Sequence, residues 1–277
     1  MTHIANIVDV SRYPIDQLDS PQGKKLINEI QIQLKEDGSC TLEDFVIPEV
    51  LQRMRCEAMT LTELAYPGPT SVSPYFFNYN IGKGLGYDNN HPTKHKGKRN
   101  LKQIAADLIP QNHLLSMLYR SSEMTDFLSL VLEQPVYEFK DPFQSLNISV
   151  MNAGGCQQWH FDSGQMVTTL LLQEPKQGGV FEYAPNIRSE ENENFDEVKK
   201  VLQGKSSRVK SLHLKPGMLS LFKGHYSLHR VTEVSGDQLR LQAILAYVTD
   251  PSRMGSIDSS IVNYGPRVAK LSSSKIL

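Results

Sequence analysis

The sequence predicts a mainly β protein with a helical N-terminal part. From Val136 onward, short runs of alternating or β-branched residues recur between turns, as in a sandwich or barrel. Before about residue 135, apolar residues recur instead at the spacing of amphipathic helices. No internal repeat or low-complexity tract divides the 277 residues. We therefore expect a single domain, 1–277, with helical support over 1–135, a β core over 136–250 and a C-terminal tail over 251–277.

Helices are expected at five places. The first carries apolar residues from Leu26 to Leu34 and ends at Asp37-Gly38, and the second has Pro48 in its first turn. The expected ranges are 22–34, 48–64, 101–108, 113–132 with a break near Ser121, and 194–203, which ends at Gly204.

Strands are expected at one early position and throughout the β core. The ranges are 41–46, 136–139, 145–152, 158–162, 166–173, 179–183, 208–213, 218–222, 227–234 and 239–248. Residues 66–99 are the least regular part of the chain, rich in Pro, Gly, Asn and Tyr. A loop of this length inside a domain is often functional, so 66–99 is a candidate lid over a binding site.

The composition excludes several classes of protein. The net charge of −1 does not indicate a nucleic-acid binder, and the basic run 94–99 is typical of a solvated loop. No apolar run reaches the roughly 20 residues that span a bilayer, so no membrane association is expected. The three cysteines do not form a disulfide framework, which favours a reducing, cytoplasmic location.

A short motif predicts a metal site. His160 and Asp162 lie two residues apart, so on a strand both side chains leave the same face. An imidazole and a carboxylate side by side are two thirds of a facial site for iron(II). His229, on a later predicted strand, is the expected third ligand. Each of these residues alone is more often structural, and it is the combination that favours a metal centre.

Arg240 is the expected partner of a dicarboxylate bound at the metal. A hairpin turn at 235–238 would pair Glu233 with Arg240 and residue 244 with His229, which puts the guanidinium on the face of the metal ligands. The Arg could then clamp the far carboxylate in a bidentate manner. The alternative role is a surface ion pair with Glu233. The opposite face of this strand is apolar, and we expect the N-terminal helices to cover it.

These residues resemble a known enzyme family. His160-Phe-Asp162, the distant His229 and an Arg eleven residues later resemble the Fe(II)/2-oxoglutarate-dependent oxygenases, which fold as a double-stranded β-helix, or jelly-roll, barrel. Longer stretches, including Gly178–Tyr183 and Leu221–Thr232, are similar to a bacterial branch that acts on free amino acids and contains hydroxylases and halogenases. The similarity covers roughly residues 136–250.

The resemblance implies a reaction and its cofactors. Iron(II) would bind His160, Asp162 and His229, and Arg240 would hold 2-oxoglutarate, the co-substrate that is converted with O2 to succinate and CO2. In the halogenating members, Gly or Ala replaces the metal carboxylate so that halide can bind the iron. Because Asp162 is present, the resemblance implies hydroxylation of an unactivated C–H bond, or a related desaturation, and disfavours halogenation.

Residues that contact the substrate are less strongly indicated. Gln158 and Gln242 are candidates by strand parity, and each could instead be a core amide. Asp141 and Asn147 lie near the strand before the site, where Asp141-Pro142 could instead form a turn. Trp159 could instead pack under a helix, and Arg188 could instead lie in an exposed loop. A small molecule, specifically a free amino acid, is the expected partner, and a homodimer is left open. Two other functions remain: an oxygenase acting on a peptide or protein side chain, and a metal-binding jelly-roll protein without turnover.

Overall fold

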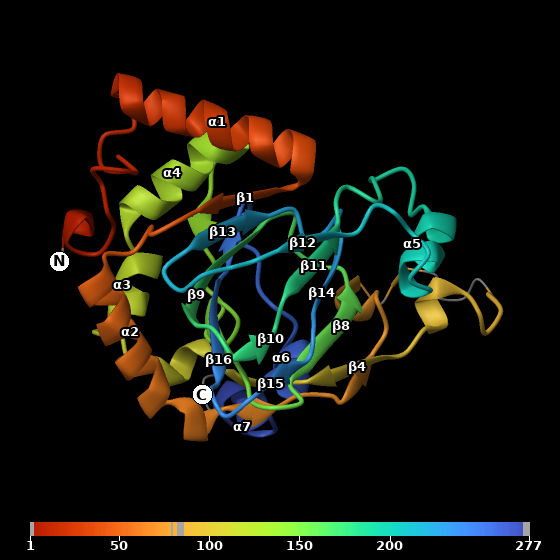
Figure 1. Cartoon of the computed structure of the whole chain (residues 1–277). Coiled ribbons are helices and arrows are strands. Elements are labelled where there is room, and N and C mark those ends of the chain that lie inside the picture. The colour runs from red at the N-terminus through yellow and green to blue at the C-terminus, as the bar shows by residue number, and fades with distance from the viewer. Residues whose placement is uncertain (1–2, 79, 82–85, 274–277) are drawn as a thin grey trace.

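Two antiparallel sheets face one another at the centre of the protein (Figure 1). The computed structural model describes residues 3–78, 80–81 and 86–273. The first sheet has seven strands in the spatial order β1 (Ser39–Leu42), β13 (Leu219–Phe222), β9 (Val167–Gln173), β16 (Arg240–Leu245), β7 (Leu146–Met151), β5 (Lys102–Ile104) and β2 (Tyr66–Pro67).

The second sheet has six strands. Their spatial order is β12 (Lys210–Leu212), β11 (Phe181–Ala184), β14 (Leu228–Val231), β8 (Cys156–His160), β4 (Gly97–Asn100) and β3 (Ser71–Val72). Two short ladders complete the β structure: β10 (Gln177–Gly178) with β15 (Val234–Ser235), and β6 (Tyr137–Glu138) with β17 (Tyr247–Val248). The expected mainly β, jelly-roll fold is confirmed as two facing sheets.

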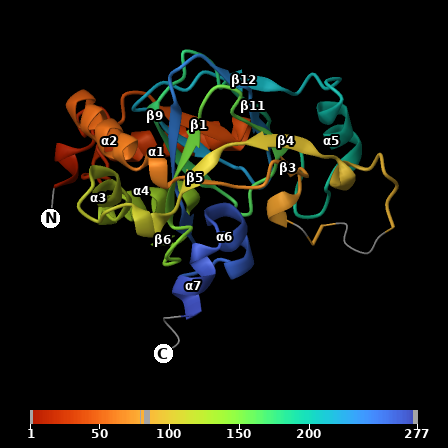
Figure 2. The ribbon, with the colours of Figure 1, turned by 90° about the horizontal axis from the view of Figure 1, so that it is seen from below.

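The helices cover the outside of the two sheets (Figures 1 and 2). Four lie on the outer side of the first sheet: α1 (Pro21–Asp37), α2 (Pro48–Thr60), α3 (Leu114–Tyr119) and α4 (Ser122–Leu132). The second sheet is covered by α5 (Phe195–Leu202), whose Val198 and Val201 pack on Trp159 and Leu228. Near the C-terminus are α6 (Ile257–Tyr264) and α7 (Arg267–Ser273). The 3-10 helices are η1 (Ile4–Asn6), η2 (Thr62–Leu64), η3 (Phe76–Asn78), η4 (Pro92–Lys94) and η5 (Ala106–Leu108).

Alternation along β16 separates the core from the interior of the sandwich. Leu241, Ala243 and Leu245 are fully buried in the main core, which they share with side chains of α1–α4. Arg240 and Gln242, of opposite parity, face the space between the sheets. Because side chains of a strand alternate between its two faces, one six-residue strand supplies both the helix-packing surface and the polar lining. The expected coverage of this apolar face by the N-terminal helices is confirmed.

Several expected elements are confirmed and others are wrong. Helices form at four of the five predicted places, with the break before Ser122, but 101–108 forms β5 and η5. Its apolar residues have helical spacing, yet pairing of Lys102–Ile104 with β7 overrides that preference. Strand β1 ends at Leu42, so the strand expected to reach 46 is shorter, and the expected tail contains α6 and α7. The support segment 1–135 also supplies strands to both sheets.

The predicted hairpin at 235–238 is wrong. Strand β14 pairs with β8 and β11 in the second sheet, whereas β16 pairs with β7 and β9 in the first. Arg240 therefore pairs with Met151 and not with Glu233. The chain crosses from one sheet to the other after Val231, which is the jelly-roll connection that a local turn motif cannot reveal.

None of the helices in the described part of the chain is long and apolar enough to cross a membrane.

Helix α1 gives a matched test of the packing. Its Ser20 cap accepts a hydrogen bond from the Gly23 N–H, and Gly38 ends it with φ 65°. Ile30 is 1% exposed against the core, while Ile32 on the same helix is 47% exposed. We expect Ile30→Ala to lower the free energy of unfolding by about 2–5 kcal/mol, because it leaves a cavity. Ile32→Ala, the control, should change it by less than about 0.5 kcal/mol in urea titrations. Equal losses for both variants would contradict this packing.

Candidate metal centre and cavity

Two histidines from neighbouring strands face one another. His160 is the last residue of β8, and it pairs directly with His229 of β14. Their ring centroids lie 4.1 Å apart, and both residues are about 5% exposed or less. Phe222 and Phe181 pack against the His229 ring, with centroids 4.8 and 5.5 Å away. The pair therefore lies in a largely apolar environment.

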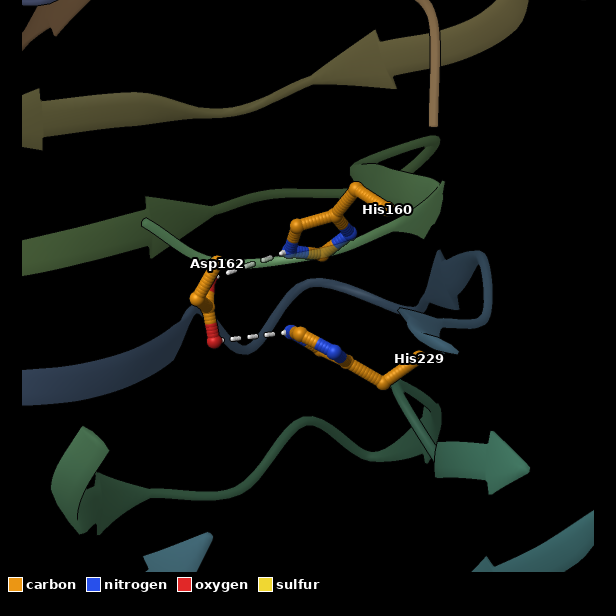
Figure 3. A group of neighbouring side chains, drawn as sticks. All are labelled: His160, Asp162 and His229. Carbon is orange, nitrogen blue, oxygen red and sulfur yellow. Dashed lines mark ion pairs between the residues drawn. The ribbon is translucent and has the colours of Figure 1, made fainter. Parts of the chain in front are cut away.

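Asp162 completes the group two residues beyond His160 (Figure 3). One carboxylate oxygen lies 3.2 Å from His229 Nε2 and the other 3.8 Å from His160 Nε2. The Asp162 N–H donates to the Gly224 carbonyl at 3.0 Å, and the Asn78 amide donates to the Asp162 carbonyl. A Cβ at Gly224 would lie 1.9 Å from the carboxylate. The absence of a side chain at Gly224 thus makes room for the acid.

The backbone fixes which nitrogen of each ring is free. His160 Nδ1 lies 2.9 Å from the Gln158 carbonyl, and His229 Nδ1 lies 2.9 Å from the Ser227 carbonyl. A carbonyl can only accept, so each Nδ1 carries the proton and donates. In the neutral rings both Nε2 atoms, which are the ring nitrogens nearest the Asp162 carboxylate, are then left unprotonated. Such outer hydrogen bonds orient metal-bound imidazoles in general.

The protonation states suit a cation. Burial, reinforced by the neighbouring His229, lowers the pKa of His160 to about 3. Burial alone would raise the pKa of Asp162, but the facing imidazoles outweigh it and hold that pKa below its ordinary value. Near neutral pH, His160 is therefore neutral and Asp162 is ionised, which are the forms that bind metal.

The three candidate ligands line a cavity of about 430 Å³ between the two sheets. Arg240, which is 3% exposed, lines the same cavity from the first sheet. Its Nη2 donates to Gln242 Oε1 at 2.7 Å, and no described carboxylate pairs with it. Glu233, the alternative partner, pairs with Lys98 at 2.7 Å. Burial lowers the pKa of Arg240 to about 10, so the guanidinium remains charged at neutral pH.

Strand parity predicted that Gln158 lines the cavity, but Gln157 lies there instead. His229 pairs with His160, but Val231 pairs with Gln157, so β8 contains one extra residue. Such a β-bulge reverses the alternation of side chains. Gln157 therefore lines the cavity, with its Nε2 2.9 Å from His160 Nε2, whereas Gln158 accepts a hydrogen bond from Arg230. Gln157 was missed because nothing in the local sequence marks the bulge.

The other candidate substrate residues divide into two groups. Asn147 and Gln242 line the cavity. Trp159 packs beneath α5, as its structural alternative predicted, and Asp141 accepts main-chain N–H groups of 143, 144 and 255 in a turn. Arg188 is neither exposed nor part of the cavity: it is buried over Phe161 and pairs with Glu193 at 2.9 Å.

The candidate lid contributes to the cavity wall. Phe76 and Phe77 of η3 line the cavity, and the Phe77 ring lies 6.0 Å from that of His160. Residues 79 and 82–85 of the expected lid lie outside the described residues. Closure of this segment remains a prediction.

The donor set fits a ferrous ion. The atoms of His160, Asp162 and His229 that could bind a metal lie within 4.8 Å of one another. They come from one side of the cavity, so a bound ion would keep open positions toward its interior. Two imidazoles and one carboxylate with open positions are the donor set of non-haem iron(II) oxygenases.

A comparison of the sequence with protein-family models agrees with this geometry. The model of halogenase D (HalD) matches residues 84–258, more than half of the chain. The chain belongs to the halogenase D family. The matched range includes all three candidate ligands and Arg240. No curated protein matches the chain in sequence.

Several solved structures share the fold of this chain. The α-ketoglutarate-dependent epimerase SnoN from nogalamycin biosynthesis has a TM-score of 0.56 and 12% identity over 81% of each chain. SnoN has also been solved with Fe3+ and α-ketoglutarate. A prolyl hydroxylase from Trichoplax adhaerens has a TM-score of 0.54 and 14% identity over 82% of this chain and 90% of that one. AviO1 from Streptomyces viridochromogenes has a TM-score of 0.54 and 13% identity over 83% of this chain and 97% of that one.

Removal of one imidazole should remove the metal. We expect His229→Ala to abolish stoichiometric binding of Fe(II) in anaerobic calorimetric titrations, since two ligands remain of three. His213→Ala is the matched control, because His213 is exposed and is not one of the candidate ligands. Iron binding by His229→Ala with wild-type affinity would exclude His229 as a ligand.

Proposed function

We propose that this protein is an Fe(II)- and 2-oxoglutarate-dependent dioxygenase that hydroxylates an unactivated C–H bond of a small molecule. A free amino acid is the substrate class expected from the sequence. One observation carries the proposal: the group formed by the buried His160 and His229 with Asp162, and the guanidinium of Arg240, which no described carboxylate pairs with, share a single cavity. A metal and a dicarboxylate together need both features.

The three ligands hold the ion and leave it accessible. The carbonyl groups of Gln158 and Ser227 keep both Nε2 atoms unprotonated, and Gly224 leaves space for the Asp162 carboxylate. When bound, iron(II) supplies the activation of O2 that no side chain can provide. The rings of Phe77, Phe181 and Phe222 pack against the two imidazoles. No protein base or nucleophile is assigned.

Arg240 binds the co-substrate in this proposal. A buried charge without a partner is strongly destabilising, so a guanidinium held this way is suited to an anionic ligand. The C5 carboxylate of 2-oxoglutarate would pair with Arg240, while its keto acid end faces the metal ligands. Gln242 orients the guanidinium through the hydrogen bond to Nη2.

Hydroxylation is favoured over halogenation although the family carries the name halogenase. Halide requires a free position where the metal carboxylate would otherwise bind, and Asp162 occupies that position here. The carboxylate is built into its surroundings: Gly224 leaves space for it, and Asn78 and Gly224 fix its backbone. A desaturation would use the same ligands.

The cavity favours a small substrate over a protein side chain. Its 430 Å³ lies within the range of roughly 300–1,000 Å³ typical of small-molecule sites. Phe76, Phe77 and Met254 form part of the wall on the side of η3 and α6. A non-catalytic metal protein would not need an unpaired Arg240 beside the ion.

The direct test is succinate formation from 2-oxoglutarate. The iron-loaded protein should produce succinate slowly alone and faster with one member of a panel of free amino acids, which gains the mass of one oxygen. Stimulation by peptides alone would favour the protein-directed alternative. Complete inactivity with tightly retained zinc would favour a structural metal.

Loss of the Arg240 charge should weaken co-substrate binding. We expect Arg240→Gln to raise the KM for 2-oxoglutarate by about ten- to hundredfold, since a charge-assisted hydrogen bond contributes roughly 1.5–3 kcal/mol. Arg12→Gln is the control, because Arg12 forms an exposed ion pair with Asp44. An unchanged KM in Arg240→Gln, measured by succinate formation, would reject the clamp.

Replacement of the metal carboxylate tests the reaction type. We expect Asp162→Gly to lose hydroxylation, because the ion loses its only anionic protein ligand. Asp162→Glu keeps the charge and should retain measurable activity if the longer side chain reaches the ion. Mass spectrometry of the product, with and without chloride, separates the outcomes. Hydroxylation by Asp162→Gly at the wild-type rate would show that Asp162 is not a ligand.

A further inference from the structure

The candidate metal ligands are only partly held by strands. Strand β8 ends at His160 and β14 begins at Leu228, so Asp162 and the segment 223–227 lie beyond the strand ends. The hydrogen bonds between β8 and β14 therefore do not fix the position of the carboxylate. Two contacts join it to the segment: the Asp162 N–H donates to the Gly224 carbonyl at 3.0 Å, and His225 Nδ1 donates to the Asp162 carbonyl at 3.3 Å.

Arg188, which lies outside the cavity, contacts both sides of this junction. Its guanidinium carbon lies 4.0 Å from the ring centroid of Phe161, the residue between two of the candidate ligands. Its Nε donates to the His225 carbonyl at 2.5 Å, and its main-chain N–H donates to the Tyr226 carbonyl at 3.2 Å. One residue thus links the end of β8 to the segment that leads into β14.

The guanidinium of Arg188 is held in one orientation. Its Nη1 donates to Glu193 at 2.9 Å, and the Arg188 side chain is 1% exposed. The ring of Phe161 is fully buried and also contacts the ring of Tyr75, with the centroids 5.3 Å apart. Because a guanidinium is planar, it can lie over an aromatic ring and donate to two acceptors at once, which an ammonium group cannot do. Arg188 is therefore a rigid link between the two segments.

A second arginine of the same sheet makes similar contacts without reaching these segments. Arg230 lies over the Trp159 ring, 4.7 Å from its centroid, and pairs with Glu182 at 2.6 Å. Among the described residues, its guanidinium donates only to side chains, those of Glu182 and Gln158. Arg230 and Trp159 lie within β14 and β8, where the strand pairing already holds the backbone. Arg230 is therefore a matched control for Arg188.

We infer that Arg188 is a positioning residue of the metal centre, which acts through Phe161 and the His225 carbonyl to hold Asp162 where iron(II) would bind. This inference rests on the proposed function. Arg188 is not among the residues that line the cavity, so it acts through its neighbours and not on the substrate or co-substrate. Both Arg188 and Glu193 lie in the segment between β11 and α5. That segment therefore supports the iron site from outside the cavity.

Iron affinity, measured together with fold stability, tests the inference. We expect Arg188→Gln to weaken iron(II) binding by about ten- to hundredfold in anaerobic calorimetric titrations, as the loss of an outer partner of a metal ligand typically does. Arg188→Lys keeps the buried charge and serves where Arg188→Gln does not fold. It loses about one hydrogen bond and should weaken iron binding by about two- to tenfold. Cobalt(II), whose visible absorption reports ligand geometry, should give an altered spectrum in both variants.

The control variant is Arg230→Gln, which also removes a stacked and paired guanidinium. Urea titrations give the free energy of unfolding that each variant loses. We expect Arg230→Gln to lose stability but to keep the wild-type iron affinity and cobalt spectrum. Wild-type iron affinity in the folded Arg188 variants, or an equal loss of affinity in Arg230→Gln, would overturn the inference. A wild type that binds no iron(II) and forms no succinate would contradict the proposed function, and the inference with it.

Discussion

The structure depends on one constraint: two imidazoles and a carboxylate must converge inside the protein while the imidazole nitrogens that face the carboxylate stay unprotonated. Direct pairing of His160 with His229 across β8 and β14 brings the rings together. Each Nδ1–H then donates a hydrogen bond to a main-chain carbonyl, so the Nε2 atoms near Asp162 are unprotonated. Glycine at 224 leaves space for the acid. Each condition is met by the backbone of β8 and β14 and of the segment that leads from β13 into β14.

The rest of the fold provides the environment for this group. The helices α1–α4 cover the outer face of the first sheet, so its strands can present apolar residues outward and polar residues to the cavity. Along β16 this alternation places Arg240 and Gln242 opposite the metal ligands. The cavity therefore combines the candidate metal group, which holds the only carboxylate among the described residues that line it, with the guanidinium of Arg240, which pairs with no described carboxylate.

Much of this arrangement could be predicted from residue types and spacing. The mainly β architecture, the convergence of His160, Asp162 and His229 and the position of Arg240 in the same cavity were predicted, because these residue types and spacings are local features of the sequence. The partners of Arg240 and the register of Gln158 were wrong for a different reason. They depend on a crossing between sheets and on a bulge in β8, which follow from tertiary pairing and leave no local trace. The basic run 94–99 was expected to be a solvated loop, but Lys98 and Arg99 lie on β4 and alternate between exposed and buried.

The most direct test of the account is the position of the ion itself. An anomalous difference map at the iron edge, from crystals grown anaerobically with iron(II), locates it without assumptions about activity. The account predicts a single strong peak within bonding distance of His160 Nε2, His229 Nε2 and a carboxylate oxygen of Asp162. A peak elsewhere, or none at full iron loading, would contradict it.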